Sequence, residues 1–422
     1  MTRAWMRVVL AALAMAATTG PAFPAEPAPA EEPDAPASWW ERDSATGDWG
    51  GLRPKLAERG IEIGLGLTAI WQANHRGGLR SHPNGRTTGS WDIEAALDTE
   101  KLGLWPGGTL LVYLEGSKGH GIDPRFVGSE FGVNADADST AGHRLQFSEY
   151  WYEQAIADGL VAIRVGKMDG SRDLDTNAFA NDECTQFLNG ALVNNPTIPF
   201  PDYALGGQII VRPCSGFYLA ATALDANAEG WTSGRDTALE SDSDWFVAAE
   251  AGVVYGIPTP AEAQLEGAVR IGVWHDPVRY DLVGRDGQTA KGESGWYLSC
   301  DQVLYKEGAD QDDSQGLGVF ARYGYAPDDY SCVEHFCSAG LHYQGLIPGR
   351  DDDVLGLGFA RGKFGRPARR GLAHGSEAVY ECYYSIPVGP GATLTVDVQY
   401  IRHPGADAPA SFVPGFRFQL DL

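Results

Sequence analysis

Apolar and polar residues alternate along much of this chain, and the alternation is strictest at its C-terminal end. In residues 416–422 (FRFQLDL), Phe and Leu occupy every second position, with Arg417, Gln419 and Asp421 between them. Successive side chains of a β-strand point to opposite faces, so this segment predicts a strand with one apolar and one polar face. A chain that ends in such a strand suggests the closing strand of a barrel.

The same period of two recurs in about sixteen segments bounded by Gly, Pro, Asp and Asn. The predicted strands are residues 62–71, 91–98, 109–115, 145–154, 160–168, 207–212, 217–224, 245–255, 265–274, 296–305, 317–325, 337–343, 353–361, 377–386, 393–401 and 412–422. An even number agrees with single-chain bacterial barrels, whereas β-sandwiches rarely contain so many strands. The pattern therefore predicts an all-β transmembrane, antiparallel up-and-down β-barrel of about sixteen strands, in which the last strand pairs with the first.

The strand predicted at residues 145–154 (LQFSEYWYEQ) has no single phase. In a regular strand, Glu149 and Trp151 share a face with Leu145 and Phe147. A β-bulge would instead place these two pairs on opposite faces. Both alternatives are compatible with the sequence.

Three other segments between or before the strands are distinctive. Residues 52–60 (LRPKLAERG) predict a short amphipathic helical turn ahead of the first strand. Residues 169–205 form a long connection rich in Asn and Pro, and long loops of this kind are usually functional. We expect this connection to fold into the barrel and narrow it. The acidic, polar connection at residues 224–244 is expected to be a solvated surface loop.

The N-terminal residues have the pattern of an export signal. Arg3 and Arg7 precede the apolar run 8–17, which is too short to span a bilayer as a helix. Residues 1–25 are therefore expected to be a signal peptide, and the Pro-, Ala- and Glu-rich residues 26–45 a linker. Residues 46–422 are expected to form the barrel.

Composition and charge limit the classes of partner. The formal net charge is −24, which argues against nucleic acid and anionic membrane surfaces as partners and makes an anion-selective lumen less expected. The 54 glycines and the abundant Trp, Tyr and Phe suit tight turns and aromatic girdles, although soluble β-proteins share this composition.

The six cysteines permit disulfides in an exported chain. They are Cys184, Cys214, Cys300, Cys332, Cys337 and Cys382. Cys332 and Cys337 are the best local pair, and free thiols are the alternative. No second pair has metal-ligand spacing, so we expect no metal site.

Five blocks of sequence resemble the carbohydrate-selective porins (OprB family) of bacterial outer membranes. They are residues 46–61 (TGDWGGLRPKLAERGI), 164–169 (RVGKMD), 177–179 (NAF), 345–359 (GLIPGRDDDVLGLGF) and 377–401 (EAVYECYYSIPVGPGATLTVDVQYI). These blocks are spread over nearly the whole predicted barrel. Cys300 and Cys382 within strands, and a terminal Leu422 where barrels often end in Phe, depart from the usual pattern.

The resemblance implies a channel in the bacterial outer membrane that admits glucose and related small sugars by passive diffusion. It implies no catalysis and no cofactor. The expected partners are the permeating sugars and outer-membrane lipid. A homo-oligomer and a monomer are both allowed.

A sugar offers hydroxyl groups and patches of C–H, so a selective lumen needs hydrogen-bonding groups opposite aromatic faces. The lumen candidates from the strands are Arg164, Gln208, Arg212, Glu266, Arg270, Trp274, Arg322, Glu381, Asp397 and Gln399. The candidates from the long connection are Asn177, Phe179, Asn194 and Asn195. For each charged candidate the alternative is an ion pair that stiffens the wall.

The enzyme alternative is weak. Glu149 with Glu153, or Glu377 with Glu381, would lie about 13 Å apart along a strand, too far for the carboxylate pair of a glycosidase. No nucleophile elbow, P-loop or zinc-protease motif occurs. The remaining alternatives are a porin for other solutes and a secreted soluble sugar-binding β-protein.

Overall fold

The structure is a computed structural model of the chain. It describes residues 42, 44–136, 143–239, 243–259, 264–282, 287–308, 314–328, 331–366, 368 and 372–422. The predicted signal peptide and nearly all of the predicted linker lie outside the described residues. The domain boundaries at residues 25 and 45 therefore stay predictions.

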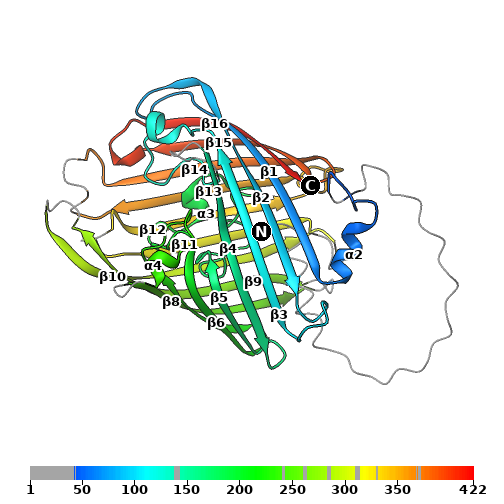
Figure 1. Cartoon of the computed structure of the whole chain (residues 1–422). Coiled ribbons are helices and arrows are strands. Elements are labelled where there is room, and N and C mark those ends of the chain that lie inside the picture. Colours follow the sequence, from blue (N-terminus) through cyan, green and yellow to red (C-terminus); the bar gives the residue numbers. More distant parts are fainter. Residues whose placement is uncertain are drawn as a thin grey trace.

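Sixteen strands form one closed barrel in which every strand is antiparallel to its two neighbours (Figure 1). The strands are β1 (Ile61–Asn74), β2 (His82–Asp98), β3 (Gly108–Lys118), β4 (His143–Ile156), β5 (Val161–Met168), β6 (Ala204–Cys214), β7 (Phe217–Asp225), β8 (Trp245–Pro258), β9 (Gln264–Asp281), β10 (Thr289–Lys306), β11 (Gly316–Tyr325), β12 (Val333–Gln344), β13 (Val354–Phe364), β14 (Ser376–Gly389), β15 (Ala392–Arg402) and β16 (Ser411–Asp421). All sixteen predicted segments are strands, so the predicted fold class is confirmed.

The barrel closes between β1 and β16, as the C-terminal pattern predicts. Leu67 pairs with Leu420 and Trp71 with Phe416, so apolar side chains of both strands share the outer face. Phe416 is 47% exposed, whereas Arg417, on the opposite face, is fully buried. The C-terminal strand β16, with its alternating apolar and polar residues, therefore closes the barrel by pairing with β1.

The two ends of the barrel differ in their connections. We call the end that holds the C-terminus and the helix α2 (Leu52–Glu58) the terminal end (Figure 1). Connections there are short, and Arg53 of α2 donates through Nη2 to the carbonyl oxygens of Ile63 and Leu422, both at 3.1 Å. The other end, the loop end, carries the π-helical turn η2 (Asp123–Val127), α3 (Gly190–Val193), α4 (Arg235–Ala238) and the 3₁₀ helix η3 (Pro404–Ala406).

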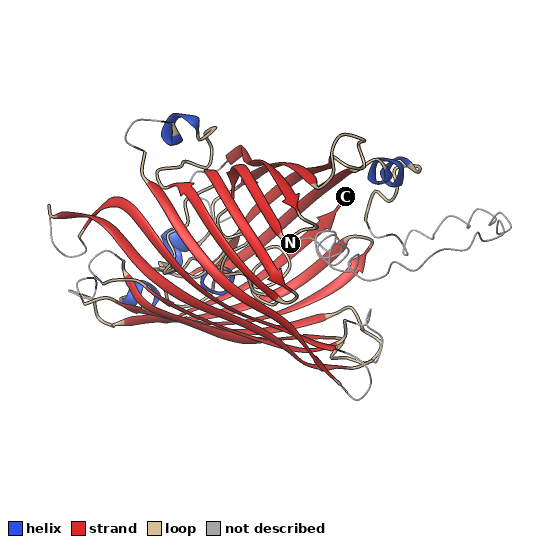
Figure 2. Ribbon diagram, turned by 90° about the horizontal axis from the view of Figure 1, so that it is seen from below, coloured by secondary structure: helices blue, strands red, loops and turns tan. Residues whose placement is uncertain are grey.

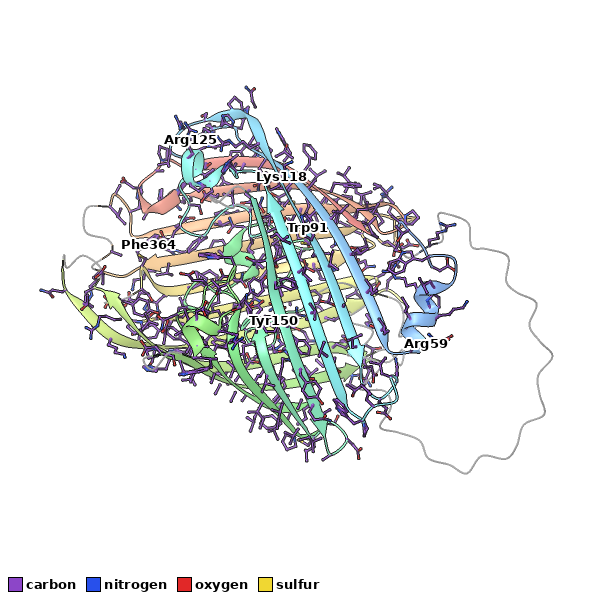
Figure 3. All side chains as sticks on the ribbon, viewed as in Figure 1. Arg59, Trp91, Lys118, Arg125, Tyr150 and Phe364 are labelled. Carbon is purple, nitrogen blue, oxygen red and sulfur yellow. The ribbon has the colours of Figure 1, made fainter. Side chains whose placement is uncertain are left out.

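Side chains project from the strands all around the barrel (Figure 3), and exposed and buried positions alternate along the strands as predicted. In β9, Ile271 and Val273 are more than half exposed on the outer face, whereas Trp274 is 2% exposed on the inner face. In β4 the ladder shifts register opposite Tyr113 and Leu114, so Leu145 and Phe147 point outward and Glu149 inward. The bulged alternative for this strand is the correct one.

Most strands are longer than predicted, and β2, β9 and β10 extend furthest beyond their predicted bounds. Their additional residues include HPNGR at the start of β2 and HDPVRYD at the end of β9. These two segments lie near the loop end of the barrel, and apolar and polar residues do not alternate along them. The alternation pattern therefore predicts strand boundaries that fall short of the true ends of β2 and β9.

The cysteines are free thiols in the structure. Cys337 lies within β12 with its side chain exposed, and Cys332 precedes the strand. Cys332 and Cys337 are therefore not joined, and the free-thiol alternative is the one the structure shows. In the part of the chain that the structure describes, no helix has the length and apolar character needed to cross a bilayer, and no cluster of three or more His, Cys, Asp or Glu could hold a metal ion.

Candidate functional site: a lumen narrowed by two inner loops

The long connection between β5 and β6 folds into the barrel, as predicted, and we call residues 169–203 the first inner loop. Figure 2 shows loop segments and short helices within the space that the strands enclose. The loop meets each strand from β8 to β16 through an inward residue: Glu250, Trp274, Ser299, Arg322, His342, Gly358, Glu381, Gln399 and Arg417. We call this inner surface of β8–β16 the covered wall.

Arg322 of β11 is the most heavily used anchor of the first inner loop. Its Nη1 donates to the carbonyl oxygens of Leu192 and Val193 at the end of α3, at 3.2 and 3.0 Å. Its Nη2 donates to the carbonyl oxygen of Asp175 and to Asn181 Oδ1, each at 2.9 Å. Arg322 is 3% exposed, so its guanidinium group binds the first inner loop and has almost no contact with solvent.

Glu381 of β14 binds the middle of the first inner loop as a hydrogen-bond acceptor, whereas Arg322 acts as a donor. Its two carboxylate oxygens accept the backbone N–H groups of Leu188 and Asn189 at 2.6 and 2.9 Å. Both side-chain oxygens act as acceptors for consecutive backbone N–H groups, so this contact fixes the start of α3 against the wall. Asn189 Nδ2 also donates to Gln399 Oε1 at 3.1 Å.

Apolar packing fills the space between the first inner loop and the covered wall. The Phe187 ring lies 5.6 Å from the Phe320 ring and 5.0 Å from the Tyr383 ring, both edge-on. A Cβ atom placed on Gly358 would come within 2.6 Å of Phe187. Glycine on the inner face of β13 therefore leaves the room that the loop occupies, which gives the alternating LGLG of residues 355–358 a structural reason.

A second inner loop, of which residues 119–136 are described, was not predicted. Gln72 Nε2 and Gln399 Nε2 donate to the carbonyl oxygen of Val133 at 2.8 and 2.9 Å. Ala135 N donates to the carbonyl oxygen of Leu188, 2.8 Å away, which joins the two inner loops. The two loops together therefore narrow the lumen.

The inner face of β2 and β3, which we call the open wall, differs from the covered wall. Asp92 and Glu94 of β2, with Tyr113 and Glu115 of β3, are only partly buried. Asp92 pairs in register with Glu115 and Glu94 with Tyr113, so these side chains form one compact acidic patch. In the predicted strand 91–98 (WDIEAALD), Asp92 and Glu94 share the polar face, but neither is among the predicted lumen candidates.

Ion pairs mark the border between the open wall and the first inner loop. Arg172 of the loop pairs with Glu149 of β4. Arg164 of β5 pairs with Asp173 of the loop and, at 2.8 Å, with Glu153 of β4. The guanidinium carbon of Arg164 also lies 4.1 Å from the centroid of the Trp151 ring. The bulge in β4 is what turns Glu149 toward this border.

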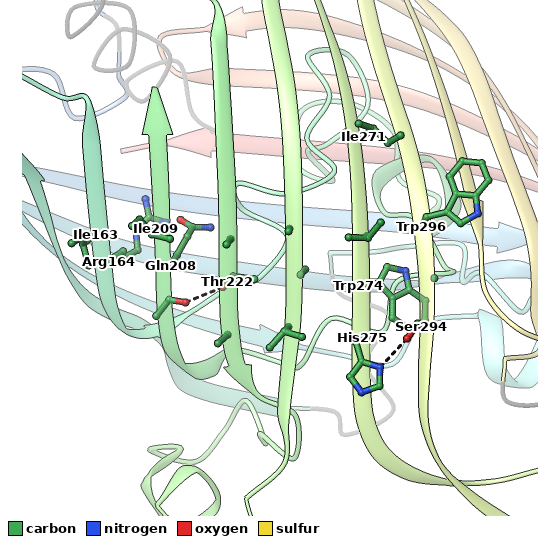
Figure 4. A pocket seen from close by; sticks show the side chains of 18 of the residues that line it. Ile163, Arg164, Gln208, Ile209, Thr222, Ile271, Trp274, His275, Ser294 and Trp296 are labelled. Atoms are coloured by element: carbon green, nitrogen blue, oxygen red, sulfur yellow. Dashed lines mark hydrogen bonds between the residues drawn. The ribbon is translucent and has the colours of Figure 1, made fainter. Parts of the chain in front are cut away.

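Three predicted candidates lie in one row across the wall. Arg164, Gln208, Thr222, Ala248 and Trp274 are consecutive register partners on β5 to β9. Figure 4 shows Arg164, Gln208, Thr222 and Trp274 in this part of the wall, where outward-facing Ile209 and Ile271 contribute to a shallow apolar depression on the outside. Trp274 packs in an apolar cluster with Leu174 and Ile198, so the first inner loop covers it.

The remaining candidates are spread over the first inner loop, the barrel wall and the terminal end. Asn177 Nδ2 donates to the carbonyl oxygen of Cys300 at 3.1 Å, and the Phe179 ring lies 5.2 Å from the His342 ring, so both hold the loop to the wall. Asn194 and Asn195 follow α3 in the same loop, and Asn195 Oδ1 accepts from Thr197 Oγ1. Arg270 pairs with Asp301 at 2.5 Å.

Asp397 accepts from Gln399 at 3.2 Å on the covered wall. Arg212 and Glu266 are exposed at the terminal end of the barrel. No observation tests which of these residues contacts a solute, and that part of the assignment stays a prediction.

Comparison with known proteins agrees with this architecture. The model of the family described as "Carbohydrate-selective porin, OprB family" matches residues 82–422. Porin B of Pseudomonas aeruginosa is 22% identical over 415 residues, which cover 88% of this chain and 90% of that protein. The putative porin QuiX of Acinetobacter baylyi is 20% identical over 435 residues, or 91% of this chain and 94% of that protein.

A solved structure of OprB from Pseudomonas putida at high pH has the same fold. It superimposes with a TM-score of 0.80 at 20% identity and covers 91% of this chain and 99% of its own. The family match spans most of the chain, and the closed sixteen-stranded barrel agrees with it. The chain therefore belongs to the carbohydrate-selective porin (OprB) family.

Proposed function

We propose that this outer-membrane sugar porin passes small neutral sugars by passive diffusion along the acidic open wall, between β2, β3 and the two inner loops. Family membership gives the outer membrane as the location and sugars as the solutes. The path, the size limit and the charge preference are the proposed parts. Porins are channels rather than enzymes, and the proposed function includes no chemical step.

The contrast in burial between the two walls supports this path. Inward residues of the covered wall, such as Glu250, Arg322 and Arg417, are at most 3% exposed because the first inner loop covers them. Asp92 and Glu94 of the open wall are partly accessible. A solute therefore meets the open wall and the edges of the loops.

The chemistry of the open wall suits sugar hydroxyl groups. Carboxylate oxygens accept hydrogen bonds from hydroxyls, and Tyr113 supplies an aromatic face on the same wall. Such contacts exchange readily with water, and weak binding is what a diffusion channel requires. The excess of carboxylates disfavours anionic solutes of the same size.

Liposome swelling tests the proposal directly. Proteoliposomes are compared for glucose, a disaccharide, and gluconate, which matches glucose in size but carries a negative charge. We expect glucose to enter fastest, the disaccharide more slowly because of the inner loops, and gluconate more slowly because of the carboxylates. Equal rates for all three solutes would refute both the size limit and the charge preference.

A further inference from the structure

Three arginines gather around one aromatic ring at the loop end of the barrel. The guanidinium carbons of Arg86, Arg80 and Arg125 lie 4.9, 5.0 and 6.0 Å from the centroid of the Phe126 ring. The imidazole of His82 stacks on the same ring, with 4.1 Å between centroids. We call these four basic side chains and Phe126 the arginine cluster.

Backbone contacts position two of the three guanidinium groups. Arg80 Nε donates to the carbonyl oxygen of Arg125, and Arg86 Nη1 donates to the carbonyl oxygen of Gly121, each at 3.3 Å. Arg80 and Arg125 are exposed, and Phe126 beneath them is 6% exposed. The ring and the carbonyl groups therefore hold the charges near one another at the surface, with N–H donors left for a ligand.

Among the described residues, no carboxylate forms an ion pair with the arginines of the cluster. Residues 75–91 contain three Arg and two His but no Asp or Glu, although the whole chain carries a net charge of −24. The adjacent Asp123 is 6% exposed and accepts a hydrogen bond from the backbone N–H of Ser129 at 2.9 Å.

We propose that the arginine cluster binds a phosphate group at the mouth of the channel. A guanidinium group matches two phosphate oxygens at once, and three of them can neutralise a phosphate of charge about −2. Their mutual repulsion favours an anion of this charge, because no ion pair with a described carboxylate neutralises the three guanidinium groups. The phosphate is carried either by lipopolysaccharide of the outer leaflet or by a free solute.

The position of the cluster does not suit onward transport of the anion. The open wall beyond it carries Asp92, Glu94 and Glu115 on the inner face of the barrel. An anion held at the mouth therefore meets repulsion further along the path. Anchoring of a phosphate-bearing glycolipid agrees better with this arrangement than capture of a solute for uptake.

The test uses the full-length barrel in detergent and the triple variant Arg80→Gln, Arg86→Gln, Arg125→Gln. One arm measures retention of purified lipopolysaccharide and of the same lipopolysaccharide after enzymatic dephosphorylation. The other arm measures inorganic phosphate by equilibrium dialysis at constant ionic strength. Arg235→Gln, an exposed arginine of α4 at the same end of the barrel, is the matched control. Heat-modifiable migration on gels confirms that each variant is folded.

We expect the triple variant to bind lipopolysaccharide more than tenfold more weakly and the control to bind as the unaltered protein does. We also expect dephosphorylation to abolish the difference between the unaltered protein and the triple variant. Saturable binding of inorganic phosphate alone, lost in the triple variant, would support the site with a free phosphate as its ligand. Equal binding by the unaltered protein and the triple variant in both arms, or no binding in either arm, would overturn the proposal. Glucose swelling stays unchanged in the triple variant, which separates this result from any failure of the proposed sugar path.

Discussion

The covered wall and the open wall are built from the same amphipathic strands but present opposite surfaces to the lumen. On the covered wall, glycine and aromatic side chains admit the first inner loop, and the charged groups there bind its backbone. Gly358, Phe320 and Arg322 are representative. On the open wall, Asp92, Glu94 and Glu115 gather on a surface that stays partly accessible, where the first inner loop reaches Glu115 through the Tyr203 hydroxyl, which donates to Oε2 at 2.8 Å.

This difference shows that an inward charge can have two unrelated roles in one barrel. Arg322 and Glu381 are inward and charged, yet their hydrogen bonds are to loop N–H and C=O groups. Asp92 and Glu94 are inward and partly accessible, and they line the solute path that we propose. The two roles differ because the first inner loop buries Arg322 and Glu381 but leaves Asp92 and Glu94 partly exposed.

The largest expected effect on sugar entry comes from replacing Arg322, which anchors the first inner loop to the covered wall. Arg322→Ala deletes the donors to Leu192, Val193 and Asp175 and leaves the Asp175 carboxylate buried without its cation. Breaking a buried pair in this way costs about 3–5 kcal/mol. The first inner loop should then detach, and disaccharide swelling should approach the glucose rate.

The control for this change is Arg366→Ala. Arg366 pairs with Asp328 at the same end of the barrel, but its side chain is 82% exposed. Exposed pairs contribute about 0–1 kcal/mol, so this variant should keep the original ratio of disaccharide to glucose rates. An unchanged ratio in Arg322→Ala as well would show that the loop does not depend on this anchor.

A smaller effect is expected from filling the space that glycine leaves on the covered wall. In Gly358→Ala the new Cβ would lie 2.6 and 2.7 Å from atoms of Phe187 and Leu192. Overpacking of this kind typically costs about 1–3 kcal/mol. The thermal midpoint, followed by gel migration, should fall, and disaccharide entry should rise.

Gly64→Ala is the matched control, because its Cβ would meet only the Cβ of Glu94, at 3.8 Å. It should leave the thermal midpoint nearly unchanged. A fall of the same size in both variants would mean that loss of strand glycine, rather than contact with the loop, explains the result.

The barrel itself could be read from the sequence because its signal is local. Alternation with period two located all sixteen strands and the partner of the C-terminal strand, and it placed Gln208, Arg270 and Asp397 on the inner face. The family resemblance agreed with the family match. Each of these conclusions depends on neighbouring residues or on short motifs.

The accessible part of the lumen could not be read in the same way. Trp274 and Arg322 have the phase of lumen residues, but the first inner loop covers them from more than seventy positions away in the chain. The second inner loop has no distinctive composition, and its docking through Val133 depends on Gln72 and Gln399. The period-two pattern predicts which face of the barrel a residue occupies. Only the tertiary structure shows whether that residue then contacts water or a loop.

The charge preference gives the next prediction and concerns the open wall alone. Asp92→Asn with Glu94→Gln removes two negative charges while keeping side-chain volume. At a separation on the order of 7 Å in water, each charge changes the energy of a monovalent anion by about 0.6 kcal/mol, or about threefold in rate. Gluconate swelling should rise several-fold while glucose swelling stays nearly constant. A parallel rise in both solutes would indicate widening rather than a change in charge.

The smallest expected effect is a pH dependence of loop docking at the covered wall. Burial raises the pKa of Asp175 from 3.8 to about 7, against the attraction of Arg322, and the nearby Glu250 adds to the rise. The docked loop therefore binds a proton that the undocked loop releases, so docking weakens as pH rises from about 4 to about 7. Burial and the adjacent Asp182 likewise raise the pKa of Glu183, in the same loop, to about 8.

Disaccharide swelling relative to glucose should therefore increase modestly from pH 5 to pH 8, because several other hydrogen bonds keep the loop mostly docked. Asp175→Asn keeps the backbone contacts to Glu250 and Arg322 and removes the titrating group. Its ratio should change less between pH 5 and pH 7, and the remaining change above pH 7 belongs to Glu183. A ratio that falls with rising pH in the unaltered protein would contradict the sign of this linkage and would place the pH sensitivity outside the first inner loop.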